Sequence, residues 1–151
     1  MKVIATNRKA YHDYEILESV EAGIVLTGTE IKSLRQGRAS IREAYARVDE
    51  GELWLIGAHI PPYGQGGIYN HEPTRIRKLL LHREQLVHFT SSSSQKGFTI
   101  IPLRIYIKKR VAKIELGLVR GRRQYDKRRV IAQRDADREM RRAIKARIGA
   151  F

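Results

Sequence analysis

Two runs of alternating side chains constrain the fold of this chain more than any other feature. The runs extend over Thr99–Ile107 and Lys113–Leu118, and in each an apolar or β-branched residue occupies every second position. Alternation with a period of two is typical of a β-strand that buries one face. The basic segment Lys108–Arg110 lies between the runs and is short enough for a tight turn. The pattern therefore predicts a long antiparallel pair of strands with one buried face.

Further strands are predicted on the N-terminal side of this pair. From Tyr14 to Leu26, β-branched and aliphatic residues recur around a break at Glu21–Gly23, which predicts two short strands or one bent strand. Ala44–Val48 and Leu53–Ile56 flank a polar segment, Asp49–Glu52, whose glycine can adopt the positive φ of a hairpin loop. About six strands in a domain of this size favour a small closed or nearly closed barrel, because closure removes exposed strand edges.

Short helices and one long loop are predicted between the strands. Thr27 and Glu30 have the spacing of a capping box, and Gly37 is placed to end the helix that follows in a left-handed conformation. A second helix is expected to stop at the polar run Ser91–Ser94. Proline and glycine are concentrated in residues 61–74, which marks a long surface loop.

The C-terminal fifth of the chain carries most of the excess positive charge. Residues 120–151 contain twelve Arg or Lys and four Asp or Glu, so they contribute +8 to the formal net charge of +14. Apolar residues recur there at every fourth position: Ala132, Ala136, Met140, Ile144 and Ile148. So narrow a stripe stabilises an isolated helix only weakly. We therefore expect a tail that is disordered when free and helical on its target.

These boundaries predict an α+β chain, mainly β with short helices, in three segments. Residues 1–12 are expected to form a basic N-terminal arm. Residues 13–120 are expected to form an antiparallel barrel of the oligonucleotide-binding type, and residues 121–151 a basic tail that is disordered or helical.

Composition argues against several functional classes. Cysteine is absent, which excludes disulfides and thiolate metal sites and agrees with a cytoplasmic protein. No stretch approaches the roughly 20 apolar residues of a membrane span. His12-Asp13 is similar to the dipeptide of some metal phosphohydrolases, but companion ligands at recognisable spacing, a phosphate-binding loop and a serine elbow are all missing. We expect no enzymatic activity, no metal, no other cofactor and no membrane partner.

Clustered basic residues predict a nucleic-acid partner. The clusters are Asn7–Lys9, Arg75–Lys78, Lys108–Arg110 and Arg120–Arg129. Arginine donates paired hydrogen bonds to phosphate oxygens, and nearby tyrosine rings can stack on unpaired bases. Any single Arg among them could equally belong to an ordinary solvated surface.

Several long motifs in this order resemble the SsrA-binding protein (SmpB) family, the partner of transfer-messenger RNA in bacterial ribosome rescue. The matching stretches are Asn7–Tyr14, Glu21–Arg35, Arg77–His82, Leu116–Leu118 and Tyr125–Arg128. Together they extend nearly from end to end of the chain. The resemblance implies an oligonucleotide-binding-type barrel and a C-terminal tail that is unstructured in the free protein.

The resemblance also implies which residues bind RNA. It gives a contact with the tRNA-like part of transfer-messenger RNA, or support of that contact, to Asn7, Tyr14, Glu21, Lys32, Arg35 and Leu80. The basic clusters and their neighbours add Arg8, Lys9, His12, Arg75, Arg77 and Lys78. A carboxylate cannot neutralise phosphate, so Glu21 would accept hydrogen bonds from RNA, orient a neighbouring Arg, or stabilise the turn before Ala22.

For the tail, the resemblance implies a reader of the ribosome. Tyr125, Asp126, Lys127 and Arg128 would lie near the decoding centre, with the following helix in the empty messenger channel. The implied function is delivery of transfer-messenger RNA to stalled ribosomes for trans-translation. The implied partners are that RNA, small-subunit rRNA and, indirectly through the charged RNA, elongation factor Tu and alanyl-tRNA synthetase, with the chain as a monomer. The alternatives are a structural ribosomal or general RNA-binding barrel protein and a metal-dependent nuclease at His12-Asp13.

Overall fold

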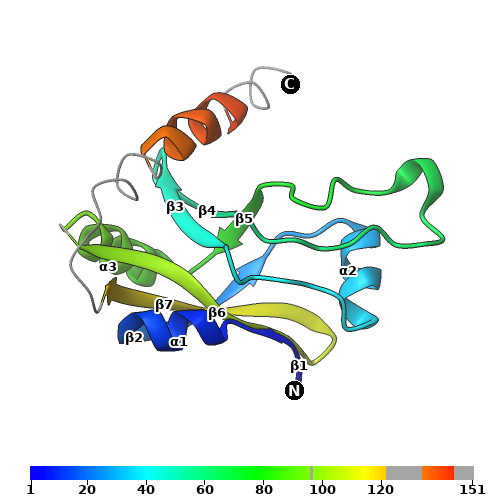
Figure 1. The fold of residues 1–151 in the computed structure, drawn as a ribbon, viewed down its shortest axis with the longest axis horizontal. Coiled ribbons are helices and arrows are strands. Elements are labelled where there is room, and N and C mark those ends of the chain that lie inside the picture. Colours follow the sequence, from blue (N-terminus) through cyan, green and yellow to red (C-terminus); the bar gives the residue numbers. More distant parts are fainter. Residues whose placement is uncertain (96, 122–133, 145–151) are drawn as a thin grey trace.

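The computed structural model of the chain describes residues 1–95, 97–121 and 134–144. Figure 1 shows a strongly curved sheet with short helices around it. The strands are β1 (Lys2–Thr6), β2 (Tyr14–Ile24), β3 (Tyr45–Asp49), β4 (Glu52–Ile56), β5 (Arg77–Leu80), β6 (Phe98–Lys108) and β7 (Val111–Gly121). The helices are α1 (Arg8–Asp13), α2 (Gly28–Arg35), the 3-10 turn η1 (Gly67–Tyr69) and α3 (Arg83–Ser93). Residues 134–144, here called the tail helix, are also helical.

Strand pairing closes the sheet into a barrel. The order is β1-β6-β3-β4-β5-β2-β7, and β6 pairs in addition with β7. The strands β6, β3, β4, β5, β2 and β7 therefore form a ring of antiparallel pairs, and β1 is added at β6. The pairing between β3 and β6 is the shortest in the ring, with one residue pair, Ala46 and Ile100. The predicted fold class, a small oligonucleotide-binding-type barrel of about six strands, is confirmed.

The predicted long antiparallel pair is β6 and β7, each of eleven residues. Its turn residues Lys109 and Arg110 both have positive φ, 51° and 66°, as a tight two-residue hairpin turn requires. The second predicted hairpin is β3–β4, where Glu50 and Gly51 have φ of 51° and 75°. Both hairpins are confirmed.

The prediction of one buried face is wrong for β6. Ile100 and Ile105 lie in the main core, whereas Ile101 and Leu103 pack on the opposite face in a second cluster with Ala10 of α1. A register shift between Pro102 and Arg104 reverses the alternation in mid-strand. The strand therefore buries apolar residues on both faces: Ile100, which a simple period of two would leave exposed, lies in the main core, and Ile101 and Leu103 pack with Ala10 of α1.

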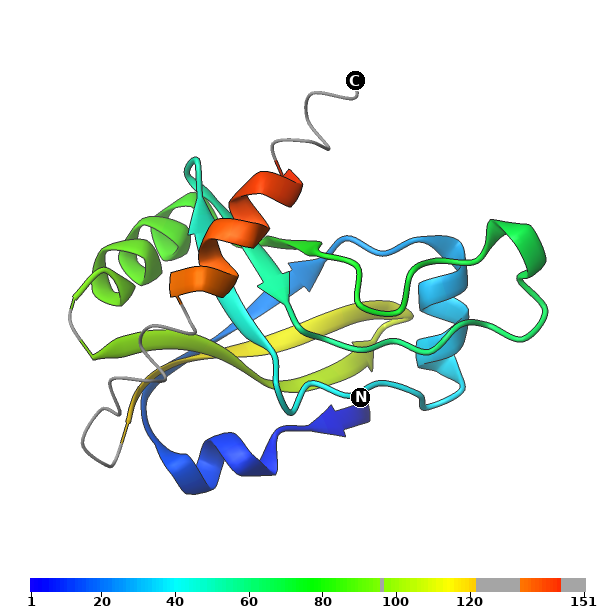
Figure 2. The same ribbon diagram turned by 45° about the horizontal axis from the view of Figure 1, so that its top comes forward.

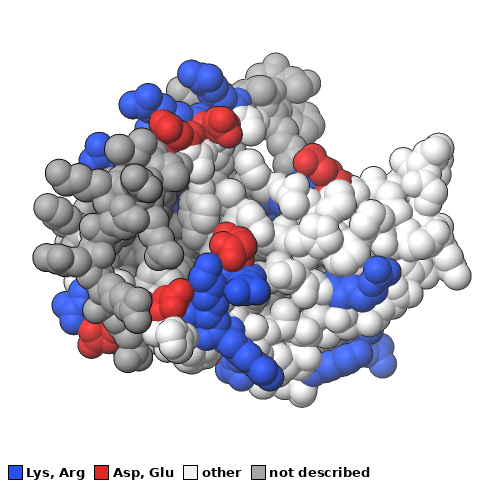
Figure 3. All heavy atoms as spheres, in the orientation of Figure 1, with Lys and Arg blue, Asp and Glu red and all other residues white. Residues whose placement is uncertain are grey.

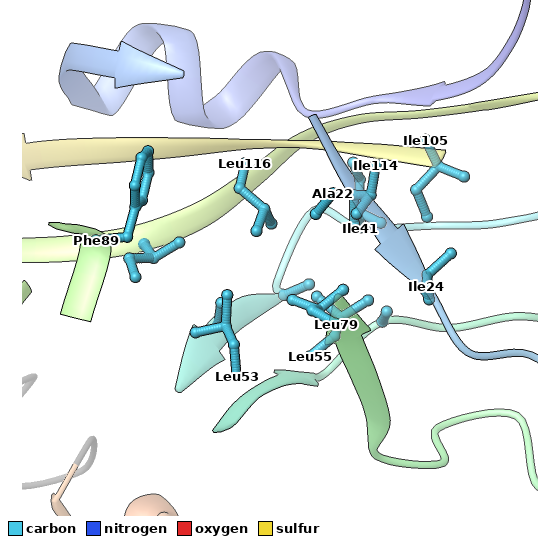
Figure 4. Packing of buried hydrophobic residues seen from close by; sticks show 14 of the residues in the cluster. Ala22, Ile24, Ile41, Leu53, Leu55, Leu79, Phe89, Ile105, Ile114 and Leu116 are labelled. Atoms are coloured by element: carbon cyan, nitrogen blue, oxygen red, sulfur yellow. The ribbon is translucent and has the colours of Figure 1, made fainter. Parts of the chain in front are cut away.

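The main core fills the interior of the barrel. Figure 4 shows Leu53, Leu79 and Leu116 pointing toward one another from facing walls, with Phe89 of α3 at one side. Because residues from six strands and α3 share this one cluster, the barrel is a packed unit and not an open sheet.

The N-terminal residues differ from the expected irregular arm. Lys2–Thr6 pair with β6, and Ile4 and Ala5 pack against the main core. Asn7 then begins α1. The following strand, β2, is continuous through Glu21–Gly23, and its irregularity lies between Ile16 and Glu18. Ile4 and Ala5 lie in a short segment that is polar and basic in composition, so the sequence analysis did not predict a strand there.

The tail helix packs against the barrel beside β3 (Figure 2). Met140 and Ile144 are 3% and 5% exposed, so two residues of the predicted stripe are buried. Residues 122–133 and 145–151, and with them Tyr125–Arg128, lie outside the described residues. That the tail is helical only on its target stays a prediction, as does the three-segment division. None of the helices in the described part is long and apolar enough to cross a membrane.

Candidate nucleic-acid interface

Charged and aromatic side chains form a connected network on the outer face of β2, β6 and β7. We call it the outer-face ladder, and its members are Glu21, Arg104, Tyr106, Lys108, Lys113 and Glu115. Strand register places them together: Tyr106 lies opposite Lys113, and Glu115 lies opposite both Arg104 and Glu21. The alternate positions Ile105 and Ile114 are in the core, so these side chains point outward.

Contacts of two carboxylates, Glu21 and Glu115, fix the geometry of the ladder. The Tyr106 hydroxyl donates to the Glu21 carboxylate at 2.5 Å, and the Lys108 ammonium lies 3.6 Å from the same oxygen. The Arg104 guanidinium donates to Glu115 at 2.5 Å and lies 5.8 Å from the centre of the Tyr106 ring. Tyr106 is 3% exposed, so it supports Glu21 and does not itself reach a ligand. The more exposed side chains that are held in this way need little further ordering to meet a ligand.

The contacts also set the charge states of the ladder. The hydrogen bond from Tyr106, followed by the positive charges of Lys108 and Lys113, lowers the pKa of Glu21. Burial and the hydrogen bond to Glu21 raise the pKa of Tyr106. At neutral pH, Glu21 is therefore an ionised acceptor and Tyr106 a neutral donor. Glu21 thus orients a tyrosine and a lysine; of the three roles considered for it from the sequence, the orienting role had named an arginine, and a hydrogen bond from RNA to Glu21 stays a prediction.

Leu80 adds an exposed apolar position beside the ladder. It is 49% exposed and pairs with Gly23 of β2, two residues from Glu21. A Cβ at Gly23 would lie 3.3 Å from the Cβ of Leu80, so glycine lets this leucine lie close over β2. Leu80 and Glu21, both predicted from the sequence, are therefore neighbours on the outer face.

The helix α2 continues the basic surface from the end of β2. The predicted capping box is present: Thr27 accepts from the Glu30 amide at 3.4 Å, and Glu30 accepts from the Thr27 amide at 2.8 Å. Lys32 and Arg35 are exposed on this helix. The Lys32 ammonium lies 5.6 Å from the ring centre of Tyr63 in the long loop, so loop and helix form one surface.

A buried ion-pair network holds α2 to the loop. Glu30 is fully buried and accepts from Arg75 at 2.6 Å and from the Nε of Arg77. The remaining Arg77 nitrogens donate to the carbonyls of Ala58 and Pro73, each at 3.0 Å. Arg77 is fully buried and Arg75 is 17% exposed. Their predicted contact with RNA phosphate is therefore corrected to a positioning role, because their donors are engaged inside the protein.

Asn7 has a similar supporting role. Its Oδ1 accepts from the Ala10 amide at 3.1 Å, which caps α1. Its Nδ2 donates to the carbonyls of Pro102 and Ile41, at 3.0 and 3.3 Å. Asn7 is buried, so it positions α1 against β6 and does not reach a ligand directly.

The other predicted residues of the N-terminal region surround α1. Arg8 is exposed, and the Lys9 ammonium lies 3.2 Å from the carboxylate of Glu43. The His12 side chain is 84% exposed and lies 3.0 Å from Asp13, whereas Tyr14 packs on the second cluster. Figures 1 and 2 show α1 and α2 toward opposite ends of the barrel. The predicted residues on and around these two helices thus form two separate groups.

Lys78 lies apart from both groups, on the outer side of β5, where its ammonium donates a hydrogen bond to Glu52 at 2.9 Å. Figure 3 shows Lys and Arg gathered along the lower edge of one face, while the long loop carries little charge. Within the described ranges, no group of three or more His, Asp or Glu is placed to hold a metal. Tyr125, Asp126, Lys127 and Arg128 lie outside those ranges.

Sequence reasoning missed four members of the ladder: Arg104, Tyr106, Lys113 and Glu115. The signal was present, because each occupies the outward position of an alternating run. Pairing the two runs across their basic turn would have placed the four on one face.

Comparison with known proteins gives one consistent relationship. The family model described as "SmpB protein" matches residues 4–146. An SsrA-binding protein of Carboxydothermus hydrogenoformans is 54% identical over 146 residues, covering 97% of this chain and 98% of its own. One of Chloroflexus aggregans is 55% identical over 147 residues, covering 97% and 93%. A solved structure, "tmRNA-SmpB: a journey to the center of the bacterial ribosome", has a TM-score of 0.70 at 49% identity and covers 85% of this chain and 90% of that chain.

Proposed function

The chain belongs to the SmpB protein family, and we propose on this basis that it binds transfer-messenger RNA and delivers it to stalled ribosomes for trans-translation. The observation that carries the proposal is that the likeness extends through both the barrel and the tail. A general RNA-binding barrel would need only the first part.

We infer that the barrel holds the tRNA-like part of the RNA with the outer-face ladder, Leu80 and α2. Lys32, Arg35, Lys108 and Lys113 supply charge for phosphate oxygens. Leu80 supplies an apolar contact for a sugar or an exposed base edge. Glu21 holds Tyr106 and Lys108 in place. As an ionised acceptor, it can also accept a hydrogen bond from an RNA 2′-hydroxyl, a group that DNA lacks.

For the tail, the proposal follows the family. Tyr125, Asp126, Lys127 and Arg128 contact the decoding centre, and the helix after them occupies the messenger channel only when the channel is empty. A cationic segment that binds in an RNA-walled channel can thus distinguish a stalled ribosome from one that still holds a message. The chain then performs no catalysis, because peptide transfer belongs to the ribosome.

The remaining partners follow from the RNA. Alanyl-tRNA synthetase charges the tRNA-like part, and elongation factor Tu carries it, so both would meet this chain through the RNA. The proposed place of action is the cytoplasm, with the chain as a monomer. Reconstituted binding of purified chain to transfer-messenger RNA, in competition with an unrelated RNA of equal length, tests the proposal.

Lys32→Ala tests the placement of the interface. Lys32 is exposed and held near Tyr63, so removing its ammonium should take away about one phosphate contact. We expect weaker binding of transfer-messenger RNA and a fall of about one in the slope of log affinity against log salt. Arg142→Ala, at an exposed position of the tail helix, is the matched control and should leave the slope unchanged. Equal slopes for Lys32→Ala and the unsubstituted chain would remove α2 from the interface.

A further inference from the structure

The long loop between β4 and β5 presents two large apolar side chains to solvent. Ile68 is 91% exposed and Tyr69 is 84% exposed, more than any other large apolar residue that the structure describes. Both belong to η1, at the end of the loop that projects past α2 (Figures 1 and 2). We call Ile68 and Tyr69 the loop tip. We propose that the loop tip stacks on an unpaired base of the bound RNA, a contact that rests on the RNA-binding function proposed above.

Hydrogen bonds within the loop close its base and shape the turn at its end. The Asn70 side chain donates to the carbonyl of Tyr63 at 2.6 Å and accepts from the Tyr63 amide at 3.0 Å. The amides of Gly66 and Tyr69 donate to the carbonyls of Tyr63 and Gly66, at 2.9 and 3.1 Å. Residues 63–70 thus form a compact turn whose two ends are tied together. Little conformational freedom remains for a ligand to remove when it binds the tip.

A second set of contacts fixes the loop to α2. The Thr29 hydroxyl lies 2.8 Å from Nδ1 of His71, and the buried Ser33 hydroxyl donates to the carbonyl of Pro61 at 2.8 Å. A Cβ at Gly66 would lie 3.0 Å from Cγ2 of Thr29, so only glycine lets the loop lie this close to the helix. Thr29 and Ser33 are four residues apart and share one face of α2. The loop is therefore held along this face, and α2 determines where the tip lies.

No neighbouring side chain shields the loop tip. Positions for a Cβ at Gly64 and Gly67 have no heavy atom within 4 Å, so a partner can approach the tip without meeting another side chain there. Binding residues are commonly found on loops that a rigid scaffold positions. Two adjacent large apolar side chains at the end of a loop that is tied down at its base therefore indicate a contact surface.

The chemistry around the tip favours an RNA base as the partner. Residues 57–71 contain no Asp, Glu, Lys or Arg, so this segment has no carboxylate to repel the phosphates on either side of a stacked base. The exposed side chains of Lys32 and Arg35 lie on the helix that holds the loop, and the Lys32 ammonium is 5.6 Å from the ring centre of Tyr63. Aromatic rings beside a cationic surface hold unpaired bases in many RNA-binding proteins.

The size of the loop tip also favours a base over a protein surface. A stable protein–protein interface buries roughly 800 Å² on each partner, far more than two side chains can offer. One base is enough to cover the ring of Tyr69, with Ile68 beside it. The tip would thus add a contact without charge to the phosphate contacts of α2.

Tyr69→Ala tests the stacking. We expect binding of transfer-messenger RNA to weaken at least about fivefold, while the slope of log affinity against log salt stays unchanged because no charge is removed. Tyr69→Phe and Tyr69→Trp keep a stacking ring and should bind within about twofold of the unsubstituted chain. Val87→Ala, at a 58% exposed position of α3, is the matched control for loss of an exposed apolar side chain. The denaturant midpoint should be the same for all of these chains, because the side chains removed are in solvent.

Each contrary result has a distinct meaning. Equal affinities for Tyr69→Ala and the unsubstituted chain would overturn the stacking, and so would a loss of affinity that Tyr69→Phe shares, which would assign the effect to the hydroxyl group. A changed salt slope for Tyr69→Ala would also overturn it, since stacking releases no counterions. If the unsubstituted chain shows no preference for transfer-messenger RNA over an unrelated RNA, the proposed function fails, while weaker binding of both RNAs by Tyr69→Ala would still support a base at the loop tip.

Photo-cross-linking identifies the partner directly. The full-length chain with benzoylphenylalanine in place of Tyr69 is irradiated with transfer-messenger RNA, both in solution and on stalled ribosomes. We expect cross-links to an unpaired nucleotide of that RNA in both cases, and none when the same photoreactive residue replaces Val87. Cross-links only to a ribosomal protein, or only to a second copy of the chain, would overturn the assignment of the loop tip to an RNA base.

Discussion

A chain that ends at Arg128 is expected to bind transfer-messenger RNA nearly as tightly as the full chain and to support no peptide tagging. The ladder, Leu80 and α2 all precede the deleted residues, so the phosphate and sugar contacts of the barrel remain. The segment proposed to occupy the messenger channel is gone. The measurement pairs an equilibrium binding assay with tagging on ribosomes stalled at the end of a message without a stop codon.

Folding of the truncated chain must be checked in the same experiment. Removal of Met140 and Ile144 uncovers part of β3 and should lower stability slightly, while the barrel core contains neither residue. Replacement of Asp126, Lys127 and Arg128 by alanine in the full chain is the companion variant, and it should bind the RNA and fail at accommodation. Loss of RNA binding in the truncated chain would show that barrel and tail do not divide the work as proposed.

The largest loss of stability is expected for Glu30→Ala. Glu30 is fully buried between Arg75 and Arg77, and Arg77 has no access to solvent. Removing the carboxylate leaves a buried guanidinium without its counter-charge, which typically costs about 3–5 kcal/mol. The variant also loses one of the two hydrogen bonds of the capping box, the one from the Thr27 amide to the Glu30 carboxylate. Denaturant unfolding followed by Trp54 fluorescence measures the free energy of unfolding.

Glu52→Ala is the matched control for this prediction. Its ion pair with Lys78 has side chains that are 47% and 37% exposed, and exposed pairs typically contribute about 0–1 kcal/mol. A loss for Glu30→Ala no greater than for Glu52→Ala would contradict the structural role given to the buried network.

The same network makes stability depend on pH in a defined direction. Burial alone would raise the pKa of Glu30, but hydrogen bonds from Arg75 and the Thr27 amide and the charge of Arg77 outweigh it, so the pKa is lowered. A carboxyl group with a lowered pKa in the folded state stabilises the fold above its unfolded pKa. That contribution should be lost as pH falls through the folded pKa, and Glu30→Ala should lack this part of the acid sensitivity.

Local patterns predicted much of the fold. The alternating runs, the Thr27 capping box and the glycine of the β3–β4 turn each depend on residues close in sequence, where spacing determines geometry. Gly37 has φ of 79°, as its place after α2 predicted. One extra residue between Pro102 and Arg104 changes the alternation of β6. The alternating pattern predicted the wrong buried face there, because a period of two does not show where the register between two strands shifts.

The candidate site was harder to predict because the sequence does not show whether a basic residue contacts RNA or forms an ion pair with a buried carboxylate. Arg77 illustrates the point: its cluster suggested phosphate binding, and its partners Glu30 and Ala58 are distant in sequence. Tyr106 illustrates the reverse, since only cross-strand pairing brings it to Glu21. The resemblance to a family supplied Glu21 and Leu80, which composition would not select.

The central claim is selective recognition of one folded RNA by the barrel. The most direct measurement is the affinity of the purified chain for transfer-messenger RNA and for an unrelated RNA of equal length across a salt series. We predict that both affinities fall with salt and that the preference for transfer-messenger RNA persists at every concentration, because shape and 2′-hydroxyl contacts do not depend on counterion release. Equal affinities with equally steep slopes would mean that charge alone holds the RNA, and would contradict the account.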